Sequence, residues 1–242
     1  MPHIDVLDHG VVRLVNHMGD DLSVVRNARV SYNAAWRAGK DSNSDEHLIN
    51  YLIRNDHSTP FEAVTFTFEV MAPLFVLRQW HRHRVQSYNE LSARYRELPE
   101  LFYVPSPEQV GVQSTTSKQA RNFVNLTAEE LSDLRVQLAD YESDCREDFR
   151  LYQRLLKAGW PRELARMKLP LSTYSHMFTT VNLWNLFRFI KLRTHVHAQY
   201  EIRQYAWALY SLARTVVPIS IDAFTEHVLG VGETPSPEIL DD

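Results

Sequence analysis

The alternation of apolar and polar positions along the chain predicts a small number of β-strands. Its clearest example runs from Val64 to Val70, where every second residue is apolar. The positions between them are Thr65, Thr67 and Glu69. Because successive side chains of a strand point to opposite faces, this segment predicts a strand with one buried face. An apolar run at Val11–Val15 predicts an earlier strand, and Thr173–Thr180 is expected to be extended.

Apolar residues at helical spacing predict helices between and after these strands. Thr127 and Glu130 form a capping box, in which both side chains bond to free backbone amides, and they begin a long amphipathic helix through Leu156. A second long helix is expected from Leu183 to Val216. Shorter helices are expected at Val24–Tyr32, from Ser44 to about Asn55, from Pro73 through Trp80 and from Pro161, with a single capped turn at Thr59–Glu62.

Together these elements predict an α+β (mixed) fold in which a small β-sheet packs with long helices. The chain has neither an internal repeat nor a clear linker, so we expect a single domain that spans residues 1–242. Residues 104–120 lack periodicity and are rich in serine, threonine and glutamine, which predicts a mobile surface loop.

The composition narrows the functional classes. A formal net charge of −4 argues against general nucleic-acid binding, which normally rests on an excess of lysine and arginine. The single cysteine, Cys145, cannot form an intramolecular disulfide, and its place among apolar helix positions predicts a core thiol. No apolar run is long enough to cross a membrane, and the first residues lack a basic start, so we expect a cytoplasmic protein with no membrane partner.

Arginines cluster between Arg78 and Arg96 without a lysine among them. A planar guanidinium binds a phosphate or carboxylate through two parallel hydrogen bonds, so the cluster favours a shaped site for a nucleotide or phosphate. A salt-bridged surface segment, with Glu90 and Glu97 as partners, is one alternative, and nucleic-acid binding is another. Three residues are expected to anchor this segment against the body of the protein: Trp80, Tyr88 and Leu91.

Other reactive side chains give weaker patterns. His81 and His83 are two residues apart and do not share a helix face, and no HExxH or CxxC pattern supports them or His57, so no metal site is expected. Ser92 lacks the flanking glycines of a hydrolase nucleophile. Because the chain has no GxGxxG or GxxxxGK[ST] pattern, any nucleotide is bound without a Rossmann or Walker loop.

The second long predicted helix carries a stripe of polar residues. Arg193, His197 and Glu201 are spaced four residues apart, which places them on one face of a continuous helix. Such a stripe is either a row of surface ion pairs or the lining of a pocket, and the sequence leaves both open.

The arginine cluster contains a motif of a known family. Arg82-His83-Arg84, followed by Ser92, resembles the RHRxxxxxxxS signature of flavin-dependent thymidylate synthases. Further blocks occur in the order of that family and extend the resemblance over about residues 20 to 215: His57–Glu62, Arg162–Glu163, Leu169–Pro170, Thr180–Asn182, Leu192–Arg193 and His197–Ile202.

The resemblance implies an enzyme that converts dUMP to dTMP by reductive methylation. Methylenetetrahydrofolate would supply the carbon, and NADPH would reduce a bound FAD that provides the hydride. The family also implies a homotetramer in which each active site is built from several subunits. No cysteine nucleophile is needed, which agrees with a core position for Cys145.

Site residues follow from the resemblance position by position. The residues that would hold FAD are His57, Thr59, Arg82, His83, Arg84, Glu90, Asn182, Arg188 and His197. Those that would hold dUMP are Gln79, Arg82, Glu90, Leu91, Ser92, Ala93, Arg94, Arg166 and Arg193. Arg166 would come from a neighbouring subunit, and Arg193 would be the catalytic residue, contacting the pyrimidine and stabilising negative charge on it.

The chain departs from the family pattern at two positions. Ala63 stands where many members have histidine, and Arg188 stands at a flavin-contacting position that is often asparagine or histidine. The arginine at 188 could pair with an FAD phosphate or point elsewhere. Two other functions stay open on the residues alone: a non-catalytic nucleotide- or RNA-binding module, and a flavin reductase acting on a different anionic substrate.

Overall fold

The computed structural model describes residues 1–230, 234–235 and 237–241. Within these residues, an antiparallel five-stranded sheet has the order β1-β2-β3-β7-β4. Its strands are β1 (His3–Val6), β2 (Gly10–Met18), β3 (Thr65–Pro73), β4 (Ser87–Glu90) and β7 (Tyr174–Asn182). The three strands predicted from the apolar pattern are confirmed as β2, β3 and β7, whereas β1 and β4 were not predicted.

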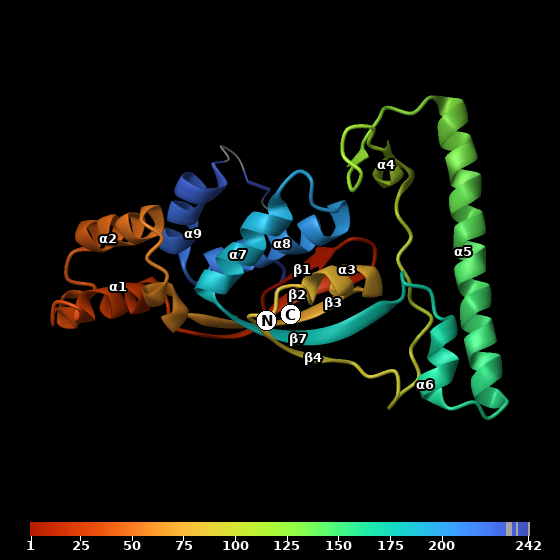
Figure 1. The fold of residues 1–242 in the computed structure, drawn as a ribbon, viewed down its shortest axis with the longest axis horizontal. Helices are drawn as coiled ribbons and strands as arrows, with labels where there is room; N and C mark the ends of the chain where they lie inside the picture. The colour runs from red at the N-terminus through yellow and green to blue at the C-terminus, as the bar shows by residue number, and fades with distance from the viewer. Residues whose placement is uncertain (231–233, 236, 242) are drawn as a thin grey trace.

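Alternation along β3 produces the two different faces of the sheet. Phe66, Phe68 and Val70 are fully buried on one face, while Thr67 and Glu69 lie on the other. The buried face is covered by α3 (Leu74–Trp80), α7 (Leu183–Thr194) and α8 (Tyr200–Arg214), which lie on one side of the sheet in Figure 1. The predicted α+β fold is therefore confirmed, with the main core between sheet and helices.

One end of the molecule is formed by short helices that pack on one another. They are α1 (Asp21–Val30), α2 (Ser42–Arg54) and α9 (Pro218–Phe224), with a π-helical turn at Thr225–Leu229 and 3₁₀ turns at Ala35–Arg37 and Thr59–Ala63. Buried Asp21 links the first helix to the last. Its carboxylate accepts from the amides of Ile219 (2.9 Å) and Ser220 (3.0 Å) and from the Ser220 hydroxyl (2.5 Å), which satisfies free donors at the start of α9.

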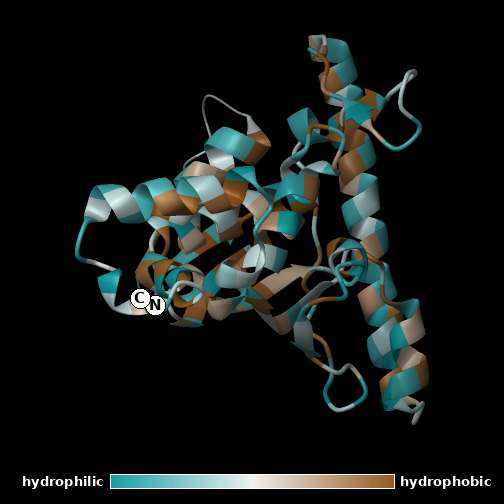
Figure 2. Ribbon diagram, turned by 60° about the vertical axis from the view of Figure 1, so that its left-hand side comes forward, coloured by the Kyte–Doolittle hydropathy of each residue, from teal (hydrophilic) through white to brown (hydrophobic). Residues whose placement is uncertain are grey.

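The other end is dominated by α5 (Ala128–Lys157), followed by α6 (Arg162–Ala165) and the 3₁₀ turn Arg166–Lys168. The predicted capping box at Thr127 and Glu130 is confirmed by reciprocal hydrogen bonds of 3.2 and 2.8 Å. Apolar and hydrophilic residues alternate in patches along α5 (Figure 2). A second, smaller core packs against the C-terminal half of this helix. It consists of Phe102, Cys145, Phe149, Tyr152 and Ala165. Cys145 is thus a core thiol, as predicted.

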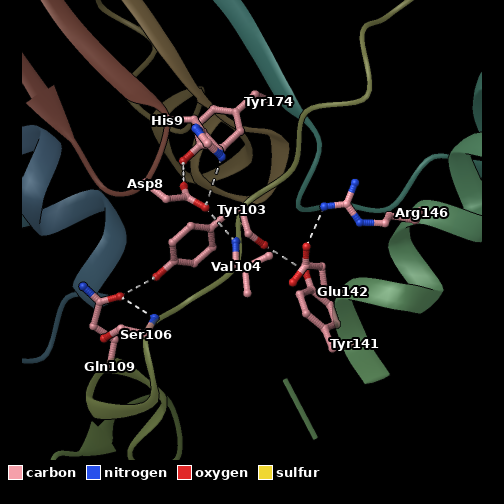
Figure 3. A network of polar contacts seen from close by, with 10 residues as sticks. All are labelled: Asp8, His9, Tyr103, Val104, Ser106, Gln109, Tyr141, Glu142, Arg146 and Tyr174. Carbon is pink, nitrogen blue, oxygen red and sulfur yellow. Dashed lines mark hydrogen bonds and ion pairs between the residues drawn. The ribbon is translucent and has the colours of Figure 1, made fainter. Parts of the chain in front are cut away.

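A polar network ties the segment before α4 (Pro107–Val110) to both the sheet and α5 (Figure 3). The Val104 amide donates to Asp8 (2.9 Å), which also accepts from the Tyr174 hydroxyl on β7. From the opposite side, the Tyr141 hydroxyl of α5 donates to the Tyr103 carbonyl (3.2 Å). Burial raises the pKa of Tyr174, so its hydroxyl stays protonated and can donate. These contacts fix the path of the chain towards the predicted loop at 104–120.

The single long helix expected from Leu183 to Val216 is wrong. The chain forms two helices that pack together, α7 and α8, separated by residues 195–199. Val196 in this connection is 71% exposed, so the apolar face of α7 does not continue through it. Folding back lets the apolar faces of both helices reach the same core, which one straight helix of this length could not do. Arg193, His197 and Glu201 therefore do not form a stripe on one helix.

Smaller differences concern the ends of elements and the predicted loop. The turn at residues 59–63 is a short 3₁₀ helix as expected for a single turn, but Ser58 precedes it without a side-chain cap, so the predicted capping box is wrong. Asp41, rather than Ser44, caps α2. The predicted loop at 104–120 contains α4 (Pro107–Val110) and β5 (Val112–Gln113), which pairs with β6 (Arg121–Asn122). Its mobility stays a prediction.

Candidate functional site

Arg193 lies in the last turn of α7 and its guanidinium is held by α3 and the turn after it. Its Nε donates to His83 Nε2 (2.9 Å), and its Nη2 donates to the Gln79 carbonyl (3.1 Å). A longer contact joins Nη1 to Gln79 Oε1 (3.5 Å). Burial lowers the pKa of Arg193. These hydrogen bonds fix the orientation of the guanidinium. Because a guanidinium has five N–H donors, N–H groups are left for a ligand.

His83 is the acceptor that orients Arg193. Its ring packs on Phe189 with centroids 4.6 Å apart. Burial, followed by the nearby charges of Arg193 and Arg188, lowers the pKa of His83 to about 4. The imidazole is therefore neutral near pH 7, which is the state in which a ring nitrogen can accept a hydrogen bond from a guanidinium.

Aromatic anchors hold the motif turn between α3 and β4. Trp80 at the end of α3 is fully buried, and the Tyr88 hydroxyl on β4 lies 3.2 Å from the Trp80 carbonyl and 2.5 Å from the His83 carbonyl. Burial raises the pKa of Tyr88 to about 12, so the hydroxyl remains a donor. The predicted anchoring by Trp80 and Tyr88 is confirmed.

Arg193 borders a cavity of about 480 Å³, within the size range of ligand sites, roughly 300–1,000 Å³. Its lining comprises Gln79, Gln119, Leu192, Arg193, His195, His197, Ala198 and Gln199. A second, mainly apolar cavity of about 600 Å³ shares Leu192 and His195 with the first and includes Arg188, Lys191, Trp184 and Phe187. The two cavities are therefore neighbours on either side of the end of α7.

A second group of predicted residues lies at α6. The Arg94 Nε is 3.6 Å from a Glu163 carboxylate oxygen, and the Arg166 Nε donates to the Glu163 carbonyl (3.3 Å). Both arginines are exposed. Ser92 is close to them in the chain, and its hydroxyl accepts from the Arg94 amide (3.3 Å). Figure 1 places α6 beside α5, away from the α7–α8 pair that borders the cavity.

The remaining predicted residues have other surroundings. Glu90 accepts from the Ser175 hydroxyl (2.7 Å), and its carboxylate is 3.9 Å from His81. The Leu91 amide continues the β4 pairing by donating to His176 (2.8 Å). Ala93 is buried, Asn182 caps α7, and four residues are exposed: His57, Thr59, Arg82 and Arg84. A helix from Pro73 that continued to Arg82 would place Arg78 and Arg82 on one face, but α3 ends at Trp80, so Arg82 lies beyond it.

The structure thus places Gln79, Arg193 and His197 in the lining of one cavity, and His83 contacts this group as the hydrogen-bond acceptor of Arg193. It also places in the lining three polar residues that the sequence reasoning did not single out as site residues: Gln119, His195 and Gln199. Gln199 belongs to the block His197–Ile202, whose resemblance to the family could have identified it as a site residue. Gln119 lies within the predicted loop and had no such signal.

Comparison with known proteins decides the family. The family described as "Thymidylate synthase complementing protein" matches residues 13–219. The chain belongs to this family. The resemblance inferred from the RHR motif and its accompanying blocks is therefore confirmed.

Other members of the thymidylate synthase complementing family match most of the chain. The flavin-dependent thymidylate synthase of Thermus thermophilus is 46% identical over 227 residues, covering 93% of this chain and 79% of that protein. The enzyme of the same name from Thermotoga neapolitana is 43% identical over 224 residues, covering 93% and 94%. Among solved structures, the UMP/dUMP methylase PolB from Streptomyces cacaoi, bound with 5-Br dUMP, has a TM-score of 0.80 at 36% identity, covering 92% of this chain and 97% of that one.

Two further observations concern the described part of the chain. None of its helices is both long and apolar enough to cross a membrane. It also has no group of three or more His, Cys, Asp or Glu side chains that could hold a metal ion.

Proposed function

We propose that this protein is a flavin-dependent thymidylate synthase, which converts dUMP to dTMP with methylenetetrahydrofolate as carbon donor and NADPH-reduced FAD as hydride source. The observation that carries the proposal is the orientation of Arg193 at the cavity by neutral His83 and by Gln79. A fixed guanidinium aimed at developing negative charge stabilises that charge without reorganising. Membership of the family supports the same conclusion.

In this proposal, FAD is held by the motif residues Arg82, His83 and Arg84, with His57, Thr59, Glu90, Asn182, Arg188 and His197. The donor set fits the cofactor, because exposed arginines suit a diphosphate, and the apolar cavity beside Arg188 has aromatic walls suited to a flat ring. His83 Nε2 is already engaged by Arg193, which leaves its other nitrogen for the cofactor. When bound, FAD supplies the hydride, while the protein positions the cofactor and the nucleotide and polarises the nucleotide.

Binding of dUMP divides between two places in the chain. Arg193 and Gln79 would contact the pyrimidine, and Glu90 and Arg82 would contact both dUMP and FAD. The phosphate is bound by Ser92 and Arg94, the backbone around Leu91 and Ala93, and Arg166 of a neighbouring subunit. Because Arg94 and Arg166 are exposed beside α6 and do not line the cavity, a complete site requires a second copy of the chain.

We therefore propose a homotetramer with shared active sites. Exposed apolar side chains surround Arg166 in sequence: Leu164 (44% exposed), Met167 (71%) and Leu171 (66%). Such a group of exposed apolar residues is typical of a subunit contact. In the assembly they would be covered, and Arg166 would be delivered to the cavity of the adjacent subunit. The cytoplasmic location remains a prediction.

The test is tritium release from 5-tritiated dUMP, with FAD, NADPH and methylenetetrahydrofolate present. We expect release by the wild-type protein, which should also show flavin absorbance. Arg193→Ala should lower the rate by about 10²–10³-fold and retain the flavin, because it removes the group that stabilises charge. Arg150→Ala, at a surface ion pair of α5 whose arginine is 63% exposed, is the matched control and should match wild type.

Two results would contradict this proposal. A wild-type protein that neither binds FAD nor releases tritium is not a thymidylate synthase. Salt-dependent RNA binding without any flavin dependence, lost in Arg82→Ala, would instead identify a nucleic-acid-binding module.

A further inference from the structure

Glu201 is a buried carboxylate at the start of α8, 2% exposed, that lies behind the cavity residue Gln199 and is hydrogen-bonded to it. Among the described residues it accepts from Arg121 Nη2 (2.7 Å), Gln199 Nε2 (2.8 Å) and the Tyr103 hydroxyl (3.3 Å). Gln199, which lines the cavity, continues the chain of contacts, because its Oε1 accepts from Gln79 Nε2.

These hydrogen bonds form a relay from Glu201 through the Gln199 and Gln79 side chains to Arg193. The carboxylate at one end and the guanidinium at the other allow only one orientation of the two amides. A carboxylate only accepts, so the Gln199 side chain must turn its NH₂ towards Glu201 and its oxygen towards Gln79. Gln79 must then donate through its own NH₂, which turns Oε1 towards Arg193 Nη1 at 3.5 Å. A guanidinium only donates, so it requires the same orientation from the other end.

We propose that Glu201 is a positioning residue that sets the direction of the Gln199 and Gln79 amides and thereby holds Arg193 in its working orientation. This inference rests on the proposed function of Arg193. If an amide in the relay turned over, an NH₂ group would face the guanidinium, and Arg193 would lose an acceptor on the side away from His83.

Arg121 connects the Glu201 carboxylate to the segment that contains Gln119, a residue of the cavity lining. Its guanidinium lies 5.4 Å from the ring centroids of both Phe123 and Tyr200, and its partner Glu201 is fixed on α8. Arg121 begins β6, two residues after Gln119, which borders the cavity. The ion pair therefore holds β6 of the β5–β6 hairpin on α8 near the cavity, and both the amide relay and the hairpin depend on the Glu201 carboxylate.

A purely structural role for Glu201 predicts a different outcome from a positioning role. A control for burial is Asp45, which is 3% exposed, pairs with Arg29 at 2.7 Å and accepts from the Gly39 amide (2.6 Å). Asp45→Asn and Glu201→Gln each remove a buried charge from an ion pair. Only the second also alters the relay, so loss of stability is common to both and loss of dUMP chemistry is specific to Glu201.

The experiment compares Glu201→Gln, Gln199→Leu and Asp45→Asn in the FAD-loaded protein. Gln199→Leu breaks the relay without removing the ion pair, so it decides the question even where Glu201→Gln does not fold. For dUMP we expect kcat/KM from tritium release to fall about 10- to 100-fold in Gln199→Leu and Glu201→Gln, the scale of a misplaced catalytic group. Reduction of FAD by NADPH should stay at the wild-type rate, and Asp45→Asn should keep wild-type kcat/KM.

The inference is overturned if Gln199→Leu keeps the wild-type kcat/KM for dUMP, or if both kinetic steps fall together in proportion to the loss in Tm. Calorimetric titration with dUMP separates this result from failure of the proposed function. A wild-type protein that binds dUMP but releases no tritium contradicts the proposed reaction alone. Weaker dUMP binding by Gln199→Leu than by Asp45→Asn would still support the positioning role.

Discussion

At the residue scale, the protonation state of His83 determines how Arg193 is held. A protonated imidazole has no acceptor and would carry a positive charge 2.9 Å from the guanidinium. Burial and the two neighbouring arginines prevent this near pH 7 by lowering the pKa of His83 to about 4. The histidine of the RHR motif thus acts as a neutral acceptor between two cations.

The lowered pKa has a consequence for stability against pH. An unfolded histidine has a pKa of about 6.5, so between about pH 6.5 and about pH 4 the unfolded chain binds a proton at position 83 that the folded protein does not. The contribution of His83 to stability is therefore present above this window and is lost as the pH falls through it. We expect His83→Gln to show a smaller loss in the free energy of unfolding between pH 7 and pH 4.5 than wild type, measured by urea denaturation.

Exposed His47 offers the control for this prediction, since among the described residues its ring contacts the Asn43 carbonyl four positions earlier in the same helix. His47→Gln should keep the wild-type pH dependence. Equal slopes for wild type and His83→Gln would show that His83 is not held neutral.

Contacts of individual site residues could be predicted only in part from the sequence. The resemblance assigned His83, Gln79 and Arg193 to the site, but their direct contacts join residues 110 and 114 positions apart. Nothing local in the sequence encodes such a contact, because it depends on how the end of α7 comes to lie beside α3 and the turn that follows it. Glu201 illustrates the same limit: it was expected on a helix stripe and is instead a buried acceptor.

At the scale of elements, apolar periodicity located β2, β3, β7 and the longer helices, but it missed β1 and β4 and could not separate α7 from α8. Periodicity reports which face is buried, and two helices that fold back on one core present the same pattern as one helix interrupted by a short exposed segment. The break at residues 195–199 brings Gln199 to the cavity. The feature that the sequence analysis missed is therefore one on which the site depends.

The cap on α9 allows a direct test at this scale. Asp21→Ala leaves the part-buried amide of Ile219 and the buried amide of Ser220 without their acceptor, which should cost about 1–3 kcal/mol of unfolding free energy, measured by urea denaturation. Asp222→Ala is the control, because this carboxylate is 54% exposed in its pair with Arg214 and should change stability by about 0.5 kcal/mol or less. Similar losses in both variants would show that the buried cap has no special role.

At the scale of the whole molecule, the fold class and the family were predictable, and the division of the site was not. The small sheet packed with helices follows from the alternation at Val64–Val70 and from the helical patterns around it. The placing of Arg94 and Arg166 beside α6, outside the cavity that Arg193 borders, depends on how α5 and α6 pack at the end of the sheet. The single domain over residues 1–242 stays a prediction and includes positions 231–233, 236 and 242, which lie outside the described residues.

Assembly can be tested through the exposed apolar residues near Arg166. Met167→Glu puts a charge where we propose a subunit contact, so light scattering should show a smaller particle than the wild-type tetramer. Tritium release should fall with it, because Arg166 would no longer reach a neighbouring cavity. Val30→Glu, at an equally exposed apolar residue (64%) in α1, should keep both properties. A Met167→Glu tetramer with wild-type activity would contradict the shared site.

The separation of Gln79 and His83 from Arg193 along the chain also has a consequence for folding. These contacts close a loop of more than a hundred residues, a class of contact that forms slowly because chain entropy must be lost first. A partly folded protein with its hairpins and helices in place would still lack the orientation of Arg193. Nucleotide that binds only the native state therefore stabilises the completed fold by mass action, and substrate supply becomes a factor in how long the protein survives in its native form.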